Sequence, residues 1–154
     1  MTSNLKANFK KNYNKTERLA FLKERHKKLI LEPRKEIESE IVLYDKYAGA
    51  VDNIDAFSHI TVFYYYHVPA PKGDGSYKVR PHRDENNPLV GVLATRGPNR
   101  PNDMGMCKAR LIEAKETSLR VAGLDAIDGS PIVDIKPYNP KHDSQPDATM
   151  PEWS

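Results

Sequence analysis

The segment from Phe57 to His67 constrains the fold of this chain more than any other stretch of its sequence. β-Branched and aromatic residues gather in it so densely that its second half, Val62-Phe63-Tyr64-Tyr65-Tyr66, is almost continuously apolar. Such residues are enriched in strands, and a strand that is apolar on both faces is normally covered on both. We therefore expect a strand here, covered by the core on one face and by further core or a partner on the other.

Further short segments of β-forming residues follow, separated by turn residues. The sequence predicts additional strands at 41–44, 90–95, 106–114, 118–124 and 132–135. The strands at 106–114 and 118–124 would form a hairpin with its turn near 115–117. Residues 69–88 are rich in Pro, Gly, Asp and Asn and predict a long loop of the kind that is usually functional or mobile. Short strands with turn-rich links are typical of a barrel or a sandwich, so we expect a mainly β (α+β) protein built on a small antiparallel β-barrel.

The first part of the chain differs from the remainder in charge. Residues 1–31 carry nine Lys or Arg and two Glu, a balance of +7, whereas the remaining 123 residues carry 15 basic and 19 acidic side chains, a balance of −4. A basic arm can follow the phosphates of a nucleic acid, and it can equally be a solvated charged face. Both interpretations stay open at this point.

An amphipathic helix is predicted over residues 16–31. Thr16 is a suitable N-cap, Pro33 ends the helical pattern, and one face of the helix would carry Leu19, Leu22, His26, Leu29 and Ile30. This stripe would pack on the body of the protein or form a dimer contact. We accordingly divide the chain into a basic arm and helix (1–39), a barrel domain (40–138) and a Pro-rich tail (139–154) that ends near Trp153.

Bulk features narrow the protein class. A length of 154 residues suits one domain, and the single cysteine, Cys107, excludes an internal disulfide framework. No apolar run is long enough to cross a membrane, and the polar, basic start lacks the apolar stretch of a signal peptide. We expect a cytoplasmic protein that makes no membrane contact.

The segment Ala94–Asn102 is the first candidate site. Arg96 ends a predicted strand, Gly97-Pro98 turns the chain, and Arg100 follows four residues after Arg96. The prolines stiffen this turn, which could present two guanidinium groups and the Asn102 amide to a carboxylate or phosphate. The alternative is a structural turn in which Arg100 pairs with an acid of the body.

Two further clusters carry polar chemistry. Asp125 and Asp128 lie three residues apart in a turn with Gly129, where their carboxylates could accept hydrogen bonds from ribose hydroxyls or an ammonium group, or serve only the turn. No His or Cys with suitable spacing accompanies them, so no metal is expected. The aromatic residues that end at His67 could stack a base or belong to the core. No nucleophile elbow, Rossmann glycine fingerprint or Walker loop is present.

Taken in order, these segments resemble the TsaA/TrmO family, the class VIII β-barrel S-adenosylmethionine-dependent tRNA methyltransferases. The resemblance covers residues 40–153 and rests on Phe57-Ser58-His59-Ile60 with the aromatic run to His67, on 90–102, on Leu124-Asp125-Ala126-Ile127-Asp128-Gly129-Ser130-Pro131-Ile132-Val133-Asp134-Ile135-Lys136-Pro137-Tyr138, and on the tail residues Asp143, Pro146-Asp147-Ala148 and Pro151-Glu152-Trp153.

The resemblance implies methyl transfer from S-adenosylmethionine to N6 of threonylcarbamoyl-adenosine at position 37, in the anticodon loop of tRNA. It also implies a homodimer with the cofactor near the subunit interface. The implied cofactor-binding residues are His67, Val68, Arg96, Met106, Asp125, Ala126, Ile127 and Asp128, and the implied substrate-binding residues are Arg100, Asn102, Lys136 and Tyr138. No catalytic residue is implied.

The sequence departs from the family pattern at two points. The family normally opens with a strand and a loop carrying Pro-Arg-Gln-Pro-Gly-like residues, and residues 1–32 show no such strand. The signature that normally continues Pro-Asn-Pro-Ile-Gly reads Pro101-Asn102-Asp103-Met104-Gly105, which adds a carboxylate beside the arginines. These departures keep two alternatives open: a non-catalytic or regulatory binding protein that retains the barrel, and a methyltransferase for another RNA or a small molecule.

Overall fold

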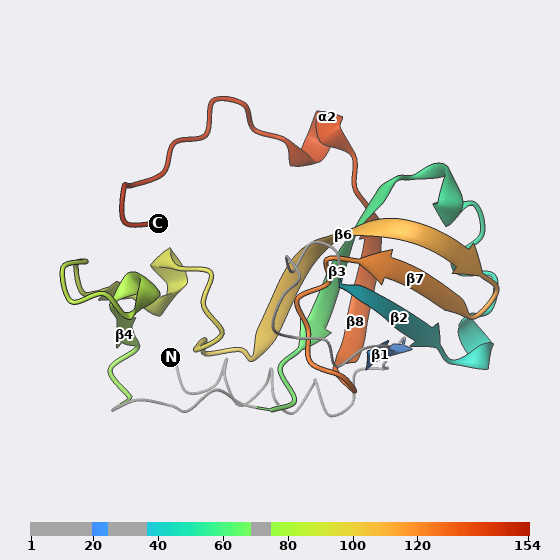
Figure 1. Cartoon of the computed structure of the whole chain (residues 1–154), viewed down its shortest axis with the longest axis horizontal. Coiled ribbons are helices and arrows are strands. Elements are labelled where there is room, and N and C mark those ends of the chain that lie inside the picture. Colours follow the sequence, from blue (N-terminus) through green and yellow to red (C-terminus); the bar gives the residue numbers. More distant parts are fainter. Residues whose placement is uncertain (1–19, 25–36, 69–74) are drawn as a thin grey trace, which may run out of the picture.

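The computed structural model describes residues 20–24, 37–68 and 75–154 (Figure 1). Strands are the main regular secondary structure of these residues. The strands are β1 (Ala20–Glu24), β2 (Glu38–Leu43), β3 (His59–Tyr65), β4 (Lys78–Val79), β5 (Val90–Gly91), β6 (Met104–Lys115), β7 (Ser118–Ala122) and β8 (Pro131–Pro137), and one short helix, α2 (Pro140–Asp143), follows β8. No helix among these residues is long and apolar enough to cross a membrane.

Six of the described strands close into a barrel in the order β1-β2-β7-β6-β3-β8. All of their pairings are antiparallel, which matches the expected small antiparallel β-barrel. The strand from the aromatic segment, β3, lies between β6 and β8, so both of its edges are paired. A register shift between Phe63 and Tyr64 interrupts the β3–β8 ladder near the end of β3.

The core fills the inside of this barrel. Along β2 every second residue is buried, because successive side chains of a strand lie on opposite faces. The fully buried hydrophobic side chains are Ile41, Ile60, Val62, Leu119, Val121 and Ile132. The hairpin predicted at 106–114 and 118–124 is confirmed as β6 and β7, and it supplies Leu119 and Val121 to this core.

The helix predicted over residues 16–31 is wrong at residues 20–24, which form β1. This strand pairs with β2 from Ala20↔Leu43 to Glu24↔Ser39 and reaches β8 through Ala20 and Phe21. An opening strand, which the sequence did not reveal, is therefore present, and the barrel begins before residue 40. The other residues of the predicted helix, and the lead-in before them, lie outside the described part of the chain.

The strand predicted over 90–95 is also wrong in its second half. Only Val90–Gly91 is strand, paired with β4, and Val92–Ala94 forms a turn of 3-10 helix. β4 and another 3-10 turn, Pro81–Arg83, lie in the region predicted to be a loop. Figure 1 shows β4 and its neighbours set apart from the barrel, with the C-terminal tail passing above the space between them.

Candidate functional site

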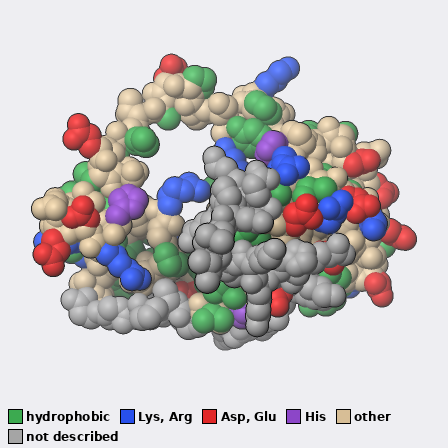
Figure 2. Space-filling model, in the orientation of Figure 1, with side chains coloured by type: hydrophobic (Ala, Val, Ile, Leu, Met, Phe, Trp, Pro, Cys, Tyr) green, Lys and Arg blue, Asp and Glu red, His purple; other side chains and the backbone are tan. Residues whose placement is uncertain are grey.

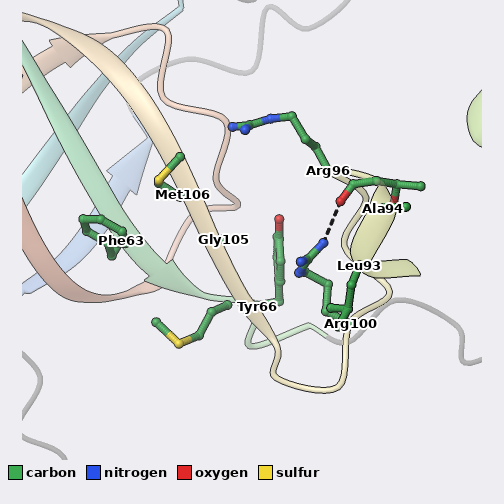
Figure 3. A pocket seen from close by; sticks show the side chains of 10 residues that line it. Phe63, Tyr66, Leu93, Ala94, Arg96, Arg100, Gly105 and Met106 are labelled. Atoms are coloured by element: carbon green, nitrogen blue, oxygen red, sulfur yellow. Dashed lines mark hydrogen bonds between the residues drawn. The ribbon is translucent and has the colours of Figure 1, made fainter. Parts of the chain in front are cut away.

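A pocket of about 460 Å³ lies where β3 ends and β6 begins. Aromatic, thioether and aliphatic groups of the barrel form one side of it, and the segment around Val92–Ala94 forms the other (Figure 3). The lining residues are Phe63, Tyr66, Leu93, Ala94, Thr95, Arg96, Arg100, Met104, Gly105 and Met106. In Figure 2 the molecule is hollowed between the barrel and the segment that carries β4, and Lys or Arg side chains lie at the edge of this hollow. The volume is in the range of small-molecule and cofactor sites.

Tyr64 fixes the wall of this pocket from inside the barrel. Its side chain is only 3% exposed, and its hydroxyl donates a hydrogen bond to the carbonyl oxygen of Asp125. Burial, followed by the neighbouring Tyr66 and Asp125, raises the pKa of the Tyr64 phenol far above its usual range. Tyr64 therefore stays a neutral donor and anchors the loop that follows β7 to the barrel.

Gly105 is the residue that makes room for this ring. It pairs with Tyr64 across the β3–β6 ladder, and a Cβ at this position would lie 2.4 Å from Tyr64 Cζ. Tyr66 packs edge-on against the same ring, with centroids 5.4 Å apart and an interplanar angle of 80°. The pocket wall is thus a set of interlocked aromatic groups around one glycine.

The turn after β7 lies beside the end of β3. The Asp125 backbone N–H donates to the Cys107 Sγ at 3.5 Å, and the Ser130 backbone N–H donates to the Ile127 carbonyl at 3.0 Å. The Ser130 hydroxyl, on a nearly buried side chain, is 3.4 Å from His67 Nδ1. These contacts bring the predicted aspartate turn and His67 together.

Arg96 is the exposed cation of the site. Within the described part of the chain, its guanidinium has no hydrogen-bond or ion-pair partner. Burial raises the pKa of the Cys107 thiol, while a hydrogen bond from the Asp125 backbone and the Arg96 charge oppose that rise, so the guanidinium lies near this thiol. Figure 3 shows the Arg96 side chain extending away from Arg100, toward the loop that follows β7. An unpaired guanidinium at a pocket edge is suited to binding a carboxylate or phosphate.

Arg100 is held by the backbone of its own loop. Its Nη1 donates to the carbonyl oxygen of Thr95 at 2.8 Å and to that of Val92 at 3.4 Å, while its side chain lines the pocket. The alternative of a structural turn predicted an acid as the partner of Arg100, whereas the structure pairs Arg100 with carbonyl oxygens. Asp103 is 9% exposed, and its Oδ2 accepts a hydrogen bond of 3.3 Å from the Tyr65 hydroxyl.

The structure gathers some of the predicted site residues and separates others. Arg96, Arg100 and Met106 line the pocket, and the Asp125–Asp128 turn adjoins it through Tyr64 and Cys107. Val68 and Ile127 are more than half exposed, Ala126 is partly buried, and Asn102 is exposed outside the lining. Lys136 and Tyr138 lie at the other end of β8, where Tyr138 contacts His59 and Lys108.

Sequence reasoning missed half of the residues that line the pocket. Phe63, Tyr66, Leu93, Met104 and Gly105 line it without having been predicted as site residues. Phe63 and Tyr66 were visible as part of the aromatic run, but the run alone does not say which rings face the core. Gly105 could be found only from the pairing of β3 with β6, which brings it opposite Tyr64.

Comparison with known proteins gives this site a context. The family model of the tRNA-methyltransferase O N-terminal domain matches residues 27–144. A probable S-adenosyl-L-methionine-binding protein of Methanothermobacter thermautotrophicus is 46% identical over 107 residues, which are 70% of this chain and 74% of that protein. The tRNA (adenine(37)-N6)-methyltransferase of Escherichia coli is 41% identical over 109 residues, 66% of this chain and 45% of that enzyme.

The fold agrees with solved structures. The crystal structure of TrmO from Pseudomonas aeruginosa aligns with a TM-score of 0.66 at 25% identity and covers 87% of this chain. This chain spans 58% of that one and less than half of the Escherichia coli enzyme. The matched residues include the barrel strands from β2 onward together with the whole pocket lining. The chain therefore belongs to the family of the tRNA-methyltransferase O N-terminal domain.

Proposed function

We propose that this protein transfers the methyl group of S-adenosylmethionine to N6 of the modified adenosine at position 37 in the anticodon loop of tRNA. The observation that carries the proposal is the pocket at the end of β3, which joins the exposed guanidinium of Arg96 to aromatic and thioether walls. The names of its relatives, an S-adenosyl-L-methionine-binding protein and a tRNA (adenine(37)-N6)-methyltransferase, support it.

The pocket residues suit S-adenosylmethionine. Arg96 matches the carboxylate of the methionine part, because a guanidinium binds a carboxylate through two parallel hydrogen bonds. Phe63, Tyr66 and Met106 match the flat adenine and the sulfonium, through stacking and through contacts of π-systems and sulfur with a cation. The backbone and carboxylates of the Asp125–Asp128 turn match the ammonium and ribose hydroxyls. The volume of about 460 Å³ suffices for a ligand of this size.

The contribution of the chain to the reaction is binding and alignment. When bound, S-adenosylmethionine supplies a methyl group on a positively charged sulfur. Among the described residues that line the pocket there is no carboxylate or imidazole, so no lining group is placed to remove a proton. An exocyclic amine sheds its proton late in such a transfer and needs no strong base. Holding the amine nitrogen in line with the methyl group can supply much of the rate enhancement.

We also propose that two copies form a homodimer and that the protein acts in the cytoplasm, where tRNA is found. Exposed apolar side chains around the pocket support the dimer: Leu93 is 68% exposed, Ile127 53% and Met106 41%. A second copy that covered them would also narrow the pocket. Light scattering should give a mass close to twice 17.5 kDa. A monomer at micromolar concentration would contradict this part of the proposal.

A second candidate is a non-catalytic S-adenosylmethionine-binding protein. The absence of an acid or base from the described lining favours it, since binding alone needs neither. The two candidates share the pocket and differ only in what happens to RNA.

One experiment separates these candidates. The purified protein is incubated with tRNA and S-adenosylmethionine carrying a labelled methyl group, and nucleosides are then analysed by mass. The proposal predicts label on N6 of the adenosine derivative at position 37. Binding of S-adenosylmethionine by calorimetry without labelled tRNA would favour the second candidate.

Arg96 provides the matching test of the site. Arg96→Ala should weaken S-adenosylmethionine binding by about 10- to 100-fold, because it removes charge-assisted hydrogen bonds. Arg96→Lys keeps the positive charge but cannot form two parallel hydrogen bonds to a carboxylate. Its affinity for S-adenosylmethionine should lie between those of Arg96→Ala and the wild type. Arg96→Ala with wild-type affinity would show that the carboxylate binds elsewhere.

A further inference from the structure

The outer surface of β8, β3 and β6 carries a group of cationic and aromatic side chains that the pocket does not use. The register places Lys136, Thr61 and Lys108 in one row across the three strands, and His59 opposite Arg110 in the next row. Tyr138 follows β8 at the level of His59, where its backbone N–H donates to the His59 carbonyl at 2.9 Å. We call His59, Lys108, Arg110, Lys136 and Tyr138 the cation face.

These side chains are arranged against one another. The Lys108 Nζ lies 4.3 Å from the centroid of the Tyr138 ring, and the His59 ring meets the same ring edge-on at 6.5 Å. The His59, Lys108, Arg110 and Lys136 side chains are exposed. Lys136 pairs with Asp134 at 3.0 Å, and no other acidic residue is found on the described outward positions of β3 and β8. The face thus combines an excess of positive charge with an accessible aromatic group.

The cation face is continuous with the pocket. Along β3, the outward residue after Thr61 is Phe63, which lines the pocket together with its register partner Met106. The step from the Thr61 row to the Phe63 row is two residues, or about 7 Å along the strand. A chain that lay along the outside of β3 would therefore pass from the cations to the pocket without leaving the barrel surface.

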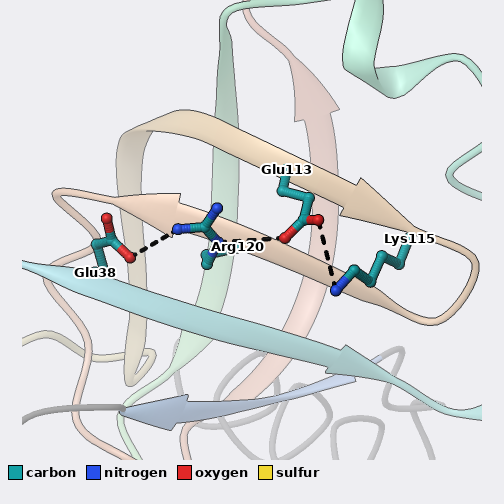
Figure 4. Close-up of polar contacts among 4 residues, drawn as sticks. All are labelled: Glu38, Glu113, Lys115 and Arg120. Carbon is teal, nitrogen blue, oxygen red and sulfur yellow. Dashed lines mark hydrogen bonds and ion pairs between the residues drawn. The ribbon is translucent and has the colours of Figure 1, made fainter.

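The neighbouring face of the barrel differs in its charge. There Arg120 binds Glu38 at 3.0 Å and Glu113 at 3.4 Å, and Glu113 also binds Lys115 at 3.5 Å (Figure 4). The carboxylates on that face neutralise its cations locally. Lys115 belongs to the same strand as Lys108 and Arg110, so β6 contributes cations to both faces.

We infer that the cation face binds the phosphate backbone of the RNA whose target base enters the pocket, with Tyr138 stacking on a neighbouring base. This inference rests on the proposed function. Lys and Arg side chains that follow a nucleic-acid backbone supply most of the sequence-independent affinity, and aromatic groups among them stack bases of unpaired strands. An RNA loop has both phosphates and unstacked bases, which an acidic protein surface lacks.

The test is equilibrium binding of an anticodon stem-loop RNA at several salt concentrations. The variant Lys108→Gln/Arg110→Gln keeps long polar side chains and removes two charges, and Lys115→Gln is its control on the same strand. The double variant should raise the Kd about tenfold or more and lower the slope of log K against log salt by roughly 0.7 to 0.9 for each phosphate that the protein no longer neutralises. Lys115→Gln should match the wild type.

Tyr138 separates stacking from charge. Tyr138→Ala should raise the Kd about tenfold with an unchanged salt slope, and Tyr138→Phe should bind as the wild type does. Poly-glutamate added as a competitor should displace little RNA. The inference is wrong if poly-glutamate displaces RNA as effectively as unlabelled stem-loop does and Tyr138→Ala leaves the Kd for RNA unchanged. The cation face would then bind acidic protein.

The controls distinguish this inference from the proposed function. Affinity for S-adenosylmethionine and the thermal midpoint should stay at wild-type values in every variant, which shows that fold and pocket are intact. Wild-type protein that leaves tRNA unmethylated would count against the proposed function. A double variant that binds RNA as Lys115→Gln does would overturn the cation face alone.

Discussion

The ring of Tyr64 lies against the backbone of Gly105, its register partner across the β3–β6 ladder, at a distance that leaves no room for a β-carbon. The same tyrosine donates its hydroxyl hydrogen bond to the carbonyl of Asp125. One side chain therefore links two strands of the barrel to the turn that adjoins the pocket. Substitutions at Tyr64 or Gly105 should therefore change both the stability of the protein and its affinity for the cofactor.

Gly105→Ala should destabilise the protein and weaken cofactor binding together. The new Cβ would meet Tyr64 Cζ at 2.4 Å, so the ring must move and its bond to Asp125 is disturbed. Overpacking of this kind costs roughly 1 to 3 kcal/mol of the free energy of unfolding. Urea unfolding and calorimetry with S-adenosylmethionine measure the two effects. Gly91→Ala is the control, because a Cβ there meets nothing within 4 Å.

Tyr64→Phe should keep the ring and lose only the anchor of the turn. We expect a loss of about 0.5 to 1.5 kcal/mol in the free energy of unfolding, and a rise of a few-fold in the Kd for S-adenosylmethionine. Tyr65→Phe serves as the comparison, since its hydroxyl binds Asp103 away from the pocket lining. Equal effects of both variants on the Kd would show that the Asp125 turn does not position the cofactor.

Tyr64 should also make the folded protein sensitive to alkali. Its pKa is raised in the folded state, chiefly by burial, so the folded protein holds this proton longer than the unfolded chain does. The contribution to stability is complete below about pH 10, the usual tyrosine pKa, and is lost as the pH rises above it. The free energy of unfolding should fall less steeply above pH 10 in Tyr64→Phe than in the wild type. Parallel curves would contradict this assignment.

Arg100 and Arg96 should behave differently when each is changed to Ala. Arg100 donates to two carbonyl oxygens of its own loop, so Arg100→Ala should cost about 1 kcal/mol of the free energy of unfolding and loosen the segment around Val92. Arg96→Ala should leave stability unchanged. Limited proteolysis measures the loosening of this segment. If the two variants have the same stability and the same affinity for S-adenosylmethionine, this division of roles is wrong.

The basic arm can be tested by truncation now that β1 is located. Removing residues 1–19 deletes five of the nine cations of the first 31 residues and keeps Ala20–Glu24. This truncation should weaken tRNA binding and flatten its salt dependence without lowering the thermal midpoint. Removing residues 1–31 also deletes a barrel strand and should lower the midpoint. Unchanged RNA affinity after the shorter truncation would exclude the arm from tRNA binding.

The strands with alternating or dense β-forming residues could be predicted from the sequence. β3, β6 and β7 were foreseen because their inward residues alternate with polar ones, or form a continuous apolar run between turn signals. β1 was not foreseen. Its segment shows helical spacing of apolar residues, and the pairing with β2 and β8, which is distant in sequence, overrides that local preference.

The site was foreseen at its charged groups and missed at its walls. Arg96 and the Asp125–Asp128 turn stand out because their charged groups can bind a carboxylate, an ammonium group or ribose hydroxyls. Gly105 looks ordinary in sequence, and its importance comes from the register of β3 with β6. The turn at Val92–Ala94 was missed because its β-forming residues predict a strand, whereas the Thr95 backbone N–H and hydroxyl both donate to the Val92 carbonyl and close a turn.

The pairing of β1 with β8, which closes the barrel, has a consequence for folding kinetics. β6 and β7 are joined by a two-residue turn, and a hairpin of this kind forms within microseconds. Among the described residues, β1 meets β8 through two residue pairs, between segments near opposite ends of the chain. Contacts so distant in sequence form slowly, and until they form the unpaired edges can join strands of other molecules. The pairing of β1 with β8, more than the burial of the core, therefore determines how long a newly made chain can aggregate.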